Sequence, residues 1–339
     1  MSIRDQIIQL VRGNNLQEDQ AAEAMEEIMT GVATPAQIAA FLTALHLKGE
    51  TEAEIAGMAR VMREKATPVE YTGPLLDTCG TGGDSSGTFN ISTTAAFVAA
   101  GAGAVVAKHG NRAMSGICGS ADLLEGLGVN IELDGVGVAR CLREAGIGFM
   151  FAPKFHPSMR YAGPVRREIG IRTAFNVLGP LTNPARARHQ VLGVADPVLA
   201  EKLAHALARL GTQHALVVHG HGGLDELALD GPNIIYEVWA GKPIQRSKVS
   251  ASELGLASAE RATVLGGDCS RNIAITQAIL NGEETGAPRD IVLLNSAAAL
   301  VAADQADDLR AGLELARESL RSGAAMRRME RLVVASQAS

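Results

Sequence analysis

The sequence predicts an α/β protein with a small all-helical domain and a larger domain built on a central, mostly parallel sheet flanked by helices. Two observations carry this prediction. Residues 1–66 show the start and stop signals of short helices, with no strand pattern between them. From Leu75 onward, short strand-like runs alternate with helical runs, which is the order typical of α/β folds.

The helices expected in the first 66 residues have recognisable ends. Thr34 followed by Pro35 predicts one helix start, because a hydroxyl cap and a proline at the first helical position are both favourable there. Thr51 with Glu54 predicts a capping box at another start. Pro68 ends this helical series.

Strands and helices then follow one another along the larger part of the chain. The runs "PLLDTC", "AVVAKHG" and "IGFMFAP" predict strands, and "STTAAFVAAG", "SADLLEGLG" and "VARCLREAG" predict helices. Further on, "HQVLGVAD", "PVLAEKLAHALARLG" and "HALVVHG" predict strand, helix and strand. The C-terminal third adds a strand "IIYEVWA", a helix "RNIAITQAILNG" and a long helix pair after "DIVLLNSAAALVA".

A charged, helical insertion at about residues 157–184 interrupts this alternation. We therefore expect a discontinuous small helical domain of residues 1–70, completed by about residues 163–183. The large α/β domain then consists of residues 74–162 and 184–339 and carries the phosphate and metal loops.

Composition excludes several classes of protein. The chain has 339 residues, a net charge of −6 and only 3% aromatic residues, so neither a polyanion-attracting field nor base-stacking platforms are expected, and no nucleic-acid partner is predicted. The four cysteines show no CxxC spacing, which argues against a zinc knuckle or a disulfide framework. No run of about 18 apolar residues occurs, so we expect a cytoplasmic protein with no membrane partner.

The stretch "DTCGTGGDSSGTFNIST" joins a predicted strand to a predicted helix through a glycine-rich loop. It lacks the lysine of a phosphate-binding P-loop, and Ser85 stands where the dinucleotide fingerprint needs its third glycine. Its glycines can still turn backbone amides inward, and a helix N-terminus follows, which predicts an anion site. An ordinary strand-to-helix turn is an equally weighted alternative for the loop taken alone.

The stretch "KHGNRAMSGICGSAD" repeats this design after the next predicted strand. Both loops are expected at the same edge of a parallel sheet, where open α/β sheets bind ligands. Lys108, His109 and Arg112 then converge with the amides on a ligand that carries more than one phosphate. For each cation taken singly, a solvated surface charge is the simpler alternative.

Two further segments carry chemistry. Asp225 and Glu226 in "HGHGGLDELAL" suit Mg²⁺, which takes one or two carboxylates together with waters and substrate phosphates. An acidic helix start explains the pair equally well. Arg166 in "VRREIGIRT" is expected to face the crevice, where its guanidinium can capture a carboxylate; a surface charge is the alternative.

The ordered motifs "DTCGTGGDSSGTFNIST", "KHGNRAMSG", "GSADLLEGLG", "FHPSMRYAGPVRREIGIRTAFNVLGPLTNP" and "GLDEL" resemble the anthranilate phosphoribosyltransferase family over nearly the whole chain. The resemblance implies a nucleoside-phosphorylase/phosphoribosyltransferase-like fold and a homodimer formed through the helical domains. It implies transfer of the phosphoribosyl group of phosphoribosyl pyrophosphate to the amine of anthranilate, in tryptophan biosynthesis.

The resemblance also implies residue roles. Those binding phosphoribosyl pyrophosphate are Gly80, Gly83, Asp84, Thr88, Asn90, Ile91, Ser92, Thr93, Lys108 and Ser120. Those binding anthranilate are Gly80, His109, Asn111, His156 and Arg166, and the metal ligands are Ser92, Asp225 and Glu226 for two Mg²⁺ per monomer with substrate bound. No general acid or base is expected, because an aromatic amine is largely unprotonated at neutral pH; catalysis then rests on positioning and metal.

One position departs from the family pattern. Ile117 and Cys118 stand where members commonly have Lys-Ser, so we expect weaker affinity for phosphoribosyl pyrophosphate. Two other functions use the same fold. A pyrimidine nucleoside phosphorylase would lack "LDEL" and "VRREIGIRT", and a non-catalytic nucleic-acid-binding relative would show a basic surface excess and eroded motifs.

Overall fold

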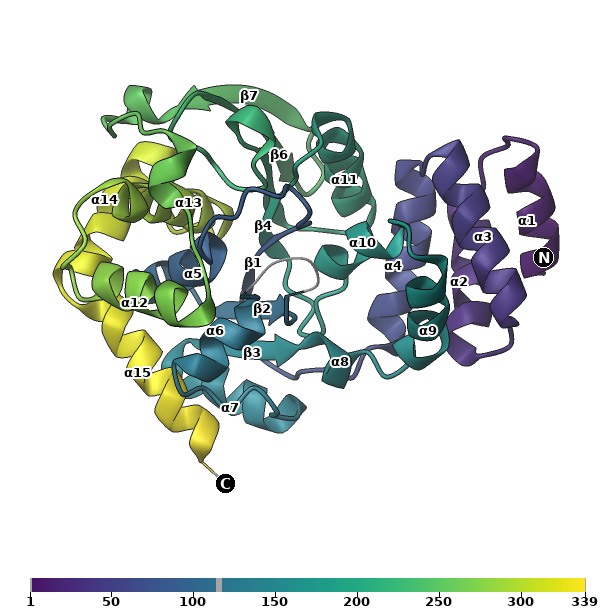
Figure 1. Ribbon diagram of the computed structural model, residues 1–339, viewed down its shortest axis with the longest axis horizontal. Helices are drawn as coiled ribbons and strands as arrows, with labels where there is room; N and C mark the ends of the chain where they lie inside the picture. Colours follow the sequence, from purple (N-terminus) through teal and green to yellow (C-terminus); the bar gives the residue numbers. More distant parts are fainter. Residues whose placement is uncertain (1, 114–117, 339) are drawn as a thin grey trace.

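The computed structural model describes residues 2–113 and 118–338 and consists of two unequal parts (Figure 1). The smaller part contains the N-terminal helices, and the larger part is a sheet with helices on both faces. The N-terminus lies at the outer edge of the small part, far from the C-terminus (Figure 1). None of the described helices is long and apolar enough to cross a membrane.

The expected N-terminal helices are present as α1 (Ile3–Val11), α2 (Glu18–Thr30), α3 (Pro35–Lys48) and α4 (Glu52–Lys65). The predicted caps of α3 and α4 are confirmed. Thr34 Oγ1 accepts a hydrogen bond from the Gln37 amide at 3.3 Å, and Thr51 Oγ1 accepts one from the Glu54 amide at 3.3 Å. Glu54 is buried and also pairs with Lys48 at 2.9 Å, which ties α4 to the end of α3.

The predicted helical insertion forms α9 (Met159–Ile169) and α10 (Phe175–Leu178). Helix α9 packs against α2 and α3, and Ala162 and Val165 lie in the same buried cluster as the N-terminal helices. Residues distant in sequence thus join the small part of the molecule (Figure 1).

The described residues contain one seven-stranded sheet in the order β3-β2-β1-β4-β5-β6-β7. The strands are β1 (Leu76–Gly80), β2 (Val106–Gly110), β3 (Ile147–Phe151), β4 (His189–Gly193), β5 (His214–His219), β6 (Pro232–Trp239) and β7 (Gln245–Ser250). Strands β1 to β5 are parallel to one another, and β6 and β7 add an antiparallel edge. The predicted mostly parallel sheet is confirmed.

Helices cover the two faces of this sheet. Val191 of β4 lies in the cluster formed with α5 and α13, and its neighbour Leu192 lies in the cluster formed with α11. This alternation is the period-two pattern of a strand buried on both sides. The helices of the large part are α5 (Ile91–Gly101), α6 (Ser120–Gly126), α7 (Gly135–Ala145), α8 (Ala152–Phe155), α11 (Pro197–Arg209), α12 (Cys269–Leu280), α13 (Ala287–Ala302), α14 (Leu309–Arg321) and α15 (Ala324–Gln337).

The strand order fixes where a ligand can bind. Strand β1 lies between β2 and β4, so the chain after β1 proceeds toward one edge and the chain after β4 proceeds toward the other. The connections diverge at this point and leave a crevice at the carboxyl ends of β1 and β4. The glycine-rich loop begins directly after β1, at the mouth of that crevice.

Candidate active site

A cleft of about 1000 Å³ lies at the carboxyl ends of the strands, and residues of α9 and α10 also line it. It brings together the glycine loop after β1, the loop after β2, the acidic pair after β5 and the start of α12. All but one of the predicted site residues line it: Gly80, Gly83, Asp84, Thr88, Asn90, Ser92, Thr93, Lys108, His109, Asn111, Ser120, His156, Arg166, Asp225 and Glu226.

Ile91 is the predicted site residue that does not line the cleft. Its side chain is 1% exposed and belongs to the core under α5. Its amide donates a hydrogen bond to the carbonyl of Phe89 at 2.7 Å. Ile91 therefore anchors the start of α5 and leaves its neighbour Ser92 at the cleft surface.

The glycine loop is fixed by carboxylates that come from a distant part of the chain. The Gly82 amide donates to Asp225 Oδ2 at 2.8 Å, and the Ser92 amide, in the first turn of α5, donates to Glu226 Oε1 at 3.1 Å. A Cβ atom on Gly193 of β4 would lie 2.5 Å from the carbonyl carbon of Asp225, so only glycine lets this segment approach.

Burial and mutual repulsion disfavour the ionised forms of the Asp225 and Glu226 carboxyl groups. Burial, with the nearby Asp84 carboxylate, raises the pKa of Asp225 to about 7. Burial and the charge of Asp225 raise the pKa of Glu226 to about 8. Oδ2 of Asp84 is buried and receives no hydrogen bond. A hard cation bound between these crowded carboxylates would stabilise their ionised forms and offset their mutual repulsion. The oxygen donors therefore fit Mg²⁺.

No three His, Cys, Asp or Glu side chains within residues 2–113 and 118–338 converge closely enough to hold a metal ion unaided.

Lys108 is buried, and its ammonium group is already engaged. Its Nζ donates to the carbonyl of Thr78 at 2.5 Å, and it lies near the buried carboxylate of Asp77. Burial lowers the pKa of Lys108 and raises that of Asp77 to about 6. Asp77 also accepts a hydrogen bond from Asn183 Nδ2 at 2.8 Å. This network fixes the Lys108 side chain at the floor of the cleft.

Arg112 does not offer the free cation that the sequence suggested. Its Nη1 lies 2.8 Å from Asp122 Oδ1 and 2.8 Å from Glu125 Oε2, both on α6. Arg112 lines the cleft with Lys108, and the expectation that both bind a phosphate ligand stays a prediction. The acidic residues of "GSADLLEG" neutralise it, because α6 begins where the loop after β2 ends.

His109 and His156 form a neutral wall of the cleft. Their ring centroids are 5.0 Å apart, and both side chains are buried. Burial lowers the pKa of His109 to about 3 and that of His156 to about 4. Nε2 of each ring has no hydrogen-bond partner. The other ring nitrogen of His109 hydrogen-bonds the backbone of Gly179, and that of His156 hydrogen-bonds the backbone of Thr182. Each Nε2 can therefore accept a hydrogen bond from a donor in the cleft.

Arg166 enters the cleft from α9. Its guanidinium carbon lies 5.1 Å from the centre of the Phe175 ring, a cation–π arrangement that fixes its direction. The side chain is partly buried, and burial lowers its pKa. Arg166 therefore presents a desolvated fork to any carboxylate between α9 and the sheet. Asn111, after β2, is exposed at the same cleft.

Several cleft residues escaped the sequence reasoning. Asn272 of α12 donates to Asn90 Oδ1 at 3.0 Å and so supports the start of α5 from 182 positions away. Gly266 and Gly267 bring the preceding segment alongside the glycine loop. Arg172, between α9 and α10, reaches the same loop. The glycine pair before Asp268, the cap of α12, was the one local signal that could have located the α12 contribution.

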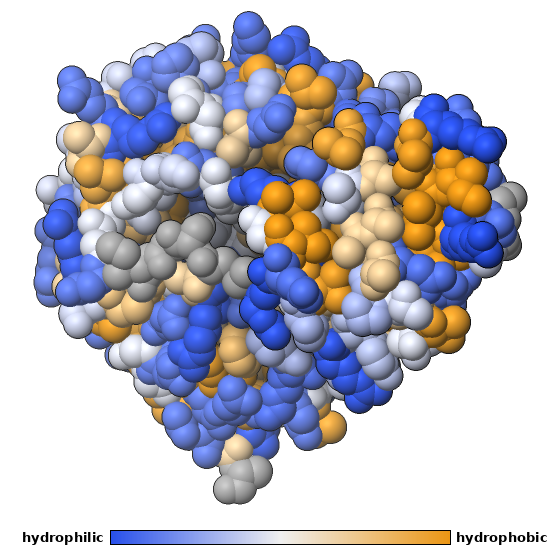
Figure 2. Space-filling model, turned by 45° about the vertical axis from the view of Figure 1, so that its right-hand side comes forward, coloured by the Kyte–Doolittle hydropathy of each residue, from blue (hydrophilic) through white to orange (hydrophobic). Residues whose placement is uncertain are grey.

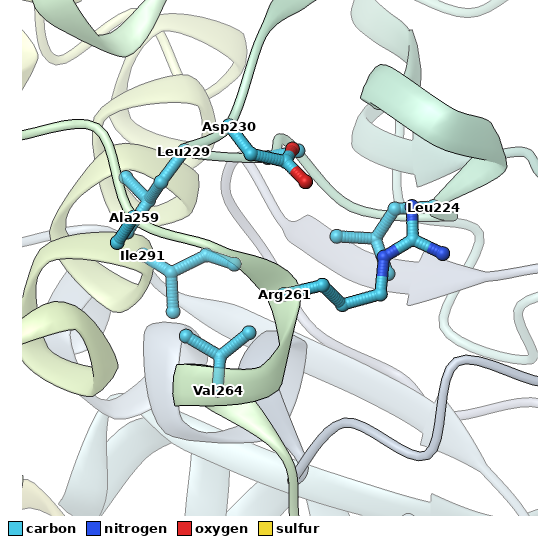
Figure 3. Close-up of a pocket in the computed structure, with 8 residues that line it drawn as sticks. Leu224, Leu229, Asp230, Ala259, Arg261, Val264 and Ile291 are labelled. Carbon is cyan, nitrogen blue, oxygen red and sulfur yellow. The ribbon is translucent and has the colours of Figure 1, made fainter.

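A second cavity lies apart from this site (Figure 3). Leu224, Val264 and Ile291 form its apolar lining, with Asp230 and Arg261 among the residues around it. Its volume of about 10 Å³ leaves room for roughly one water molecule. No substrate fits there, so the large cleft is the candidate active site.

Two family models match the two parts of the chain that enclose this cleft. The model of the glycosyl transferase family helical bundle domain matches residues 4–66, and that of the glycosyl transferase family a/b domain matches residues 72–326. The fold and the site thus define a two-domain glycosyl transferase.

Similar proteins narrow this class. The chain is 75% identical over 336 residues to the anthranilate phosphoribosyltransferase of Roseiflexus castenholzii and 67% identical to that of Chloroflexus aggregans, covering 99% of each protein and of this chain. The chain belongs to the anthranilate phosphoribosyltransferase family.

Solved structures agree. That of the Thermus thermophilus anthranilate phosphoribosyltransferase has a TM-score of 0.93 and 46% identity, covering 98% of this chain and 100% of its own. That of the Saccharomyces cerevisiae enzyme in complex with phosphoribosyl pyrophosphate and Mg has a TM-score of 0.90 and 27% identity, covering 98% and 97%.

Proposed function

We propose that the cleft carries out the reaction of its family. The phosphoribosyl group of 5-phosphoribosyl 1-pyrophosphate passes to the amine of anthranilate, giving N-(5-phosphoribosyl)anthranilate and pyrophosphate, in tryptophan biosynthesis. The bond from the ribose C1 to pyrophosphate breaks, a bond from C1 to nitrogen forms, and the amine loses a proton. The single observation that carries the proposal is that the glycine loop, the acidic pair and Arg166 line one cleft.

The phosphoribosyl donor lies on the glycine loop. Backbone amides at the start of α5 donate hydrogen bonds to its phosphate oxygens, as helix N-termini do, and the buried Lys108 side chain lies beneath them. The residues that bind it are Gly80, Gly83, Asp84, Thr88, Asn90, Ile91, Ser92, Thr93, Lys108 and Ser120. Ile91 acts by placing the first turn of α5, since its side chain is buried.

Ser92, Asp225 and Glu226 hold Mg²⁺, two ions per monomer with substrate bound. The raised pKa values of Asp225 and Glu226 and the unpaired Asp84 oxygen support this assignment. When bound, the metal neutralises the leaving pyrophosphate. The residues themselves orient the glycine loop, through the hydrogen bonds to Gly82 and Ser92.

The anthranilate acceptor lies across the cleft. Arg166 captures its carboxylate by two parallel hydrogen bonds, and Gly80 and Asn111 contact it from the sheet side. His109 and His156 line the tunnel by which it arrives. Both rings are neutral at pH 7, so they receive the aromatic amine without repelling a developing positive charge on the ribose. No residue is assigned as general acid or base, and rate enhancement comes from alignment and charge neutralisation.

The division of the chain and its assembly complete the proposal. The small domain comprises residues 1–70 and about 163–183, and the large domain comprises residues 74–162 and 184–339. A homodimer forms through the helical domain, where Val11, Val32 and Leu47 are more than 65% exposed. Figure 2 shows hydrophobic residues gathered toward the side of the molecule where this domain lies. The location is the cytoplasm.

One assay tests the proposal. Purified protein with phosphoribosyl pyrophosphate and Mg²⁺ should remove anthranilate fluorescence and release one pyrophosphate per anthranilate consumed. Omitting either substrate is the control. Phosphorolysis of thymidine or uridine, without loss of anthranilate, would favour the pyrimidine nucleoside phosphorylase alternative and overturn the proposal.

A further inference from the structure

Arg172 lies in the segment between α9 and α10 and reaches the glycine loop from across the cleft. A Cβ atom on Gly83 would lie 2.8 Å from Cζ of Arg172 and 3.1 Å from its Nη2. The guanidinium therefore rests directly on the backbone of Gly83. Gly83 has φ of +77°, so glycine is favoured there for two separate reasons, the backbone conformation and the arginine above it.

This guanidinium is available to a ligand. Arg172 is exposed and lines the cleft, and in the described part of the chain no ion pair or hydrogen bond engages it. A surface arginine usually turns toward water, and packing against a glycine in a concave site is a specific placement.

Three other cations of the cleft already have partners. Lys108 donates to the Thr78 carbonyl, Arg112 pairs with two carboxylates of α6, and Arg166 lies over Phe175. The sequence from residue 113 to residue 121 contains no lysine or arginine, so the loop after β2 offers no replacement. Arg172 is thus the uncommitted cation that touches the glycine loop in the described residues.

We propose that Arg172 is a binding residue for the pyrophosphate group of the phosphoribosyl donor. The inference rests on the proposed function and deepens it. A planar guanidinium matches two phosphate oxygens at once, so Arg172 closes over the pyrophosphate while the amides of the loop bind it from beneath.

Two substitutions and a matched control test this role. Arg172→Gln removes the charge and keeps much of the length, whereas Arg172→Lys keeps the charge and loses the fork. Arg167→Gln is the control, because Arg167 is an exposed arginine that lines the same cleft five positions earlier and does not touch the loop. Thermal unfolding of each variant verifies that the fold is retained.

The measurements distinguish an effect on binding of the phosphoribosyl donor from an effect on binding of anthranilate. We expect Arg172→Gln to raise the KM for phosphoribosyl pyrophosphate and the Kd for inorganic pyrophosphate with Mg²⁺, measured by calorimetry, by about 10- to 100-fold. Arg172→Lys should fall between it and the wild type, and the KM for anthranilate should stay within about twofold. A folded Arg172→Gln protein that binds pyrophosphate like the wild type would overturn the proposal, as would equal losses for both substrates.

The pyrophosphate measurement does not depend on turnover. If the wild type consumed no anthranilate but bound pyrophosphate through Arg172, the proposed function would fail and this inference would stand. If the wild type consumed anthranilate normally and Arg172→Gln bound pyrophosphate as tightly as the wild type, the proposed function would stand and this inference would fail.

Discussion

Asp225→Asn should make the protein more stable at alkaline pH while impairing its magnesium-dependent activity. Asparagine keeps an oxygen that can accept the Gly82 amide, so the hydrogen bond seen at 2.8 Å can persist. What disappears is a buried negative charge beside Asp84 and Glu226. Removing that charge relieves a repulsion that only a bound cation would otherwise relieve.

The magnitude follows from the pKa of the buried carboxyl. With a pKa of about 7 in the folded protein and 3.8 as its model value, ionised Asp225 destabilises the fold by roughly 4 kcal/mol at most, at 1.36 kcal/mol per pH unit. Relaxation around the charge reduces this, so we expect about 2 kcal/mol to be recovered. For a protein of 339 residues that corresponds to a rise in Tm of about 3 °C.

The sign of the pH dependence follows from proton linkage. The folded state holds the Asp225 proton more tightly than the unfolded state does. The contribution of this carboxyl to the free energy of unfolding therefore falls as pH rises from about 4 to about 7. The Tm difference between Asp225→Asn and the wild type should therefore be largest above pH 8 and shrink steadily toward pH 4. Thermal unfolding followed at several pH values measures it.

The control is Asp307→Asn, which removes an exposed carboxylate outside the cleft and should leave Tm nearly unchanged at every pH. Mg²⁺ at pH 8.5 should stabilise the wild type more than Asp225→Asn. An Asp225→Asn protein no more stable than the wild type at pH 8.5, or a Tm difference that ignores pH, would refute the reasoning.

Three further predictions concern other parts of the molecule. Arg166→Ala should lower kcat/KM for anthranilate by about 10- to 100-fold through loss of a charge-assisted pair, with Arg167→Ala near wild type; equal effects would contradict the assigned role. Burial, with contact from a second thiol, raises the pKa of Cys118 to about 12, so peptide-level mass spectrometry should show slow iodoacetamide labelling at pH 8; labelling as fast as free cysteine would argue against it. The His214 hydrogen bond lowers the pKa of Glu237, so the stability lost by Glu237→Gln at pH 6 should vanish as pH falls below about 4; a loss that stays constant with pH would exclude the Glu237 carboxylate as its cause.

Local patterns were sufficient to predict most of the fold. The capping residues of α3 and α4 act within one helical turn, so a single sequence displays them, and the structure confirms both. The alternation of strands and helices after Leu75 likewise follows from the period of apolar residues. Strand β7 was missed because its residues, "QRSKVS", are polar and mostly exposed, and it pairs only as an edge strand.

Contacts between distant segments were harder to predict. The pattern around Arg112 resembles a phosphate loop, but the carboxylates that neutralise it sit 10 and 13 residues later on a helix whose orientation no local rule provides. Asn272 and Arg172 reach the site only because the sheet order and the helical insertion place them there. The weaker donor affinity expected from Ile117 and Cys118 remains a prediction, since Ile117 lies outside the described residues.

The hydrogen bonds of the glycine loop explain why the acidic pair and the phosphate site act as one binding site. The amides of Gly82 and Ser92, which a phosphate would use, donate to Asp225 and Glu226. Any phosphate that accepts these amides must first displace two carboxylates, which would leave two buried negative charges beside a third anion. Mg²⁺ resolves this conflict, because it can bind the displaced carboxylates and the arriving phosphates together. Donor and metal should therefore bind cooperatively, and pyrophosphate without a divalent cation should bind far more weakly.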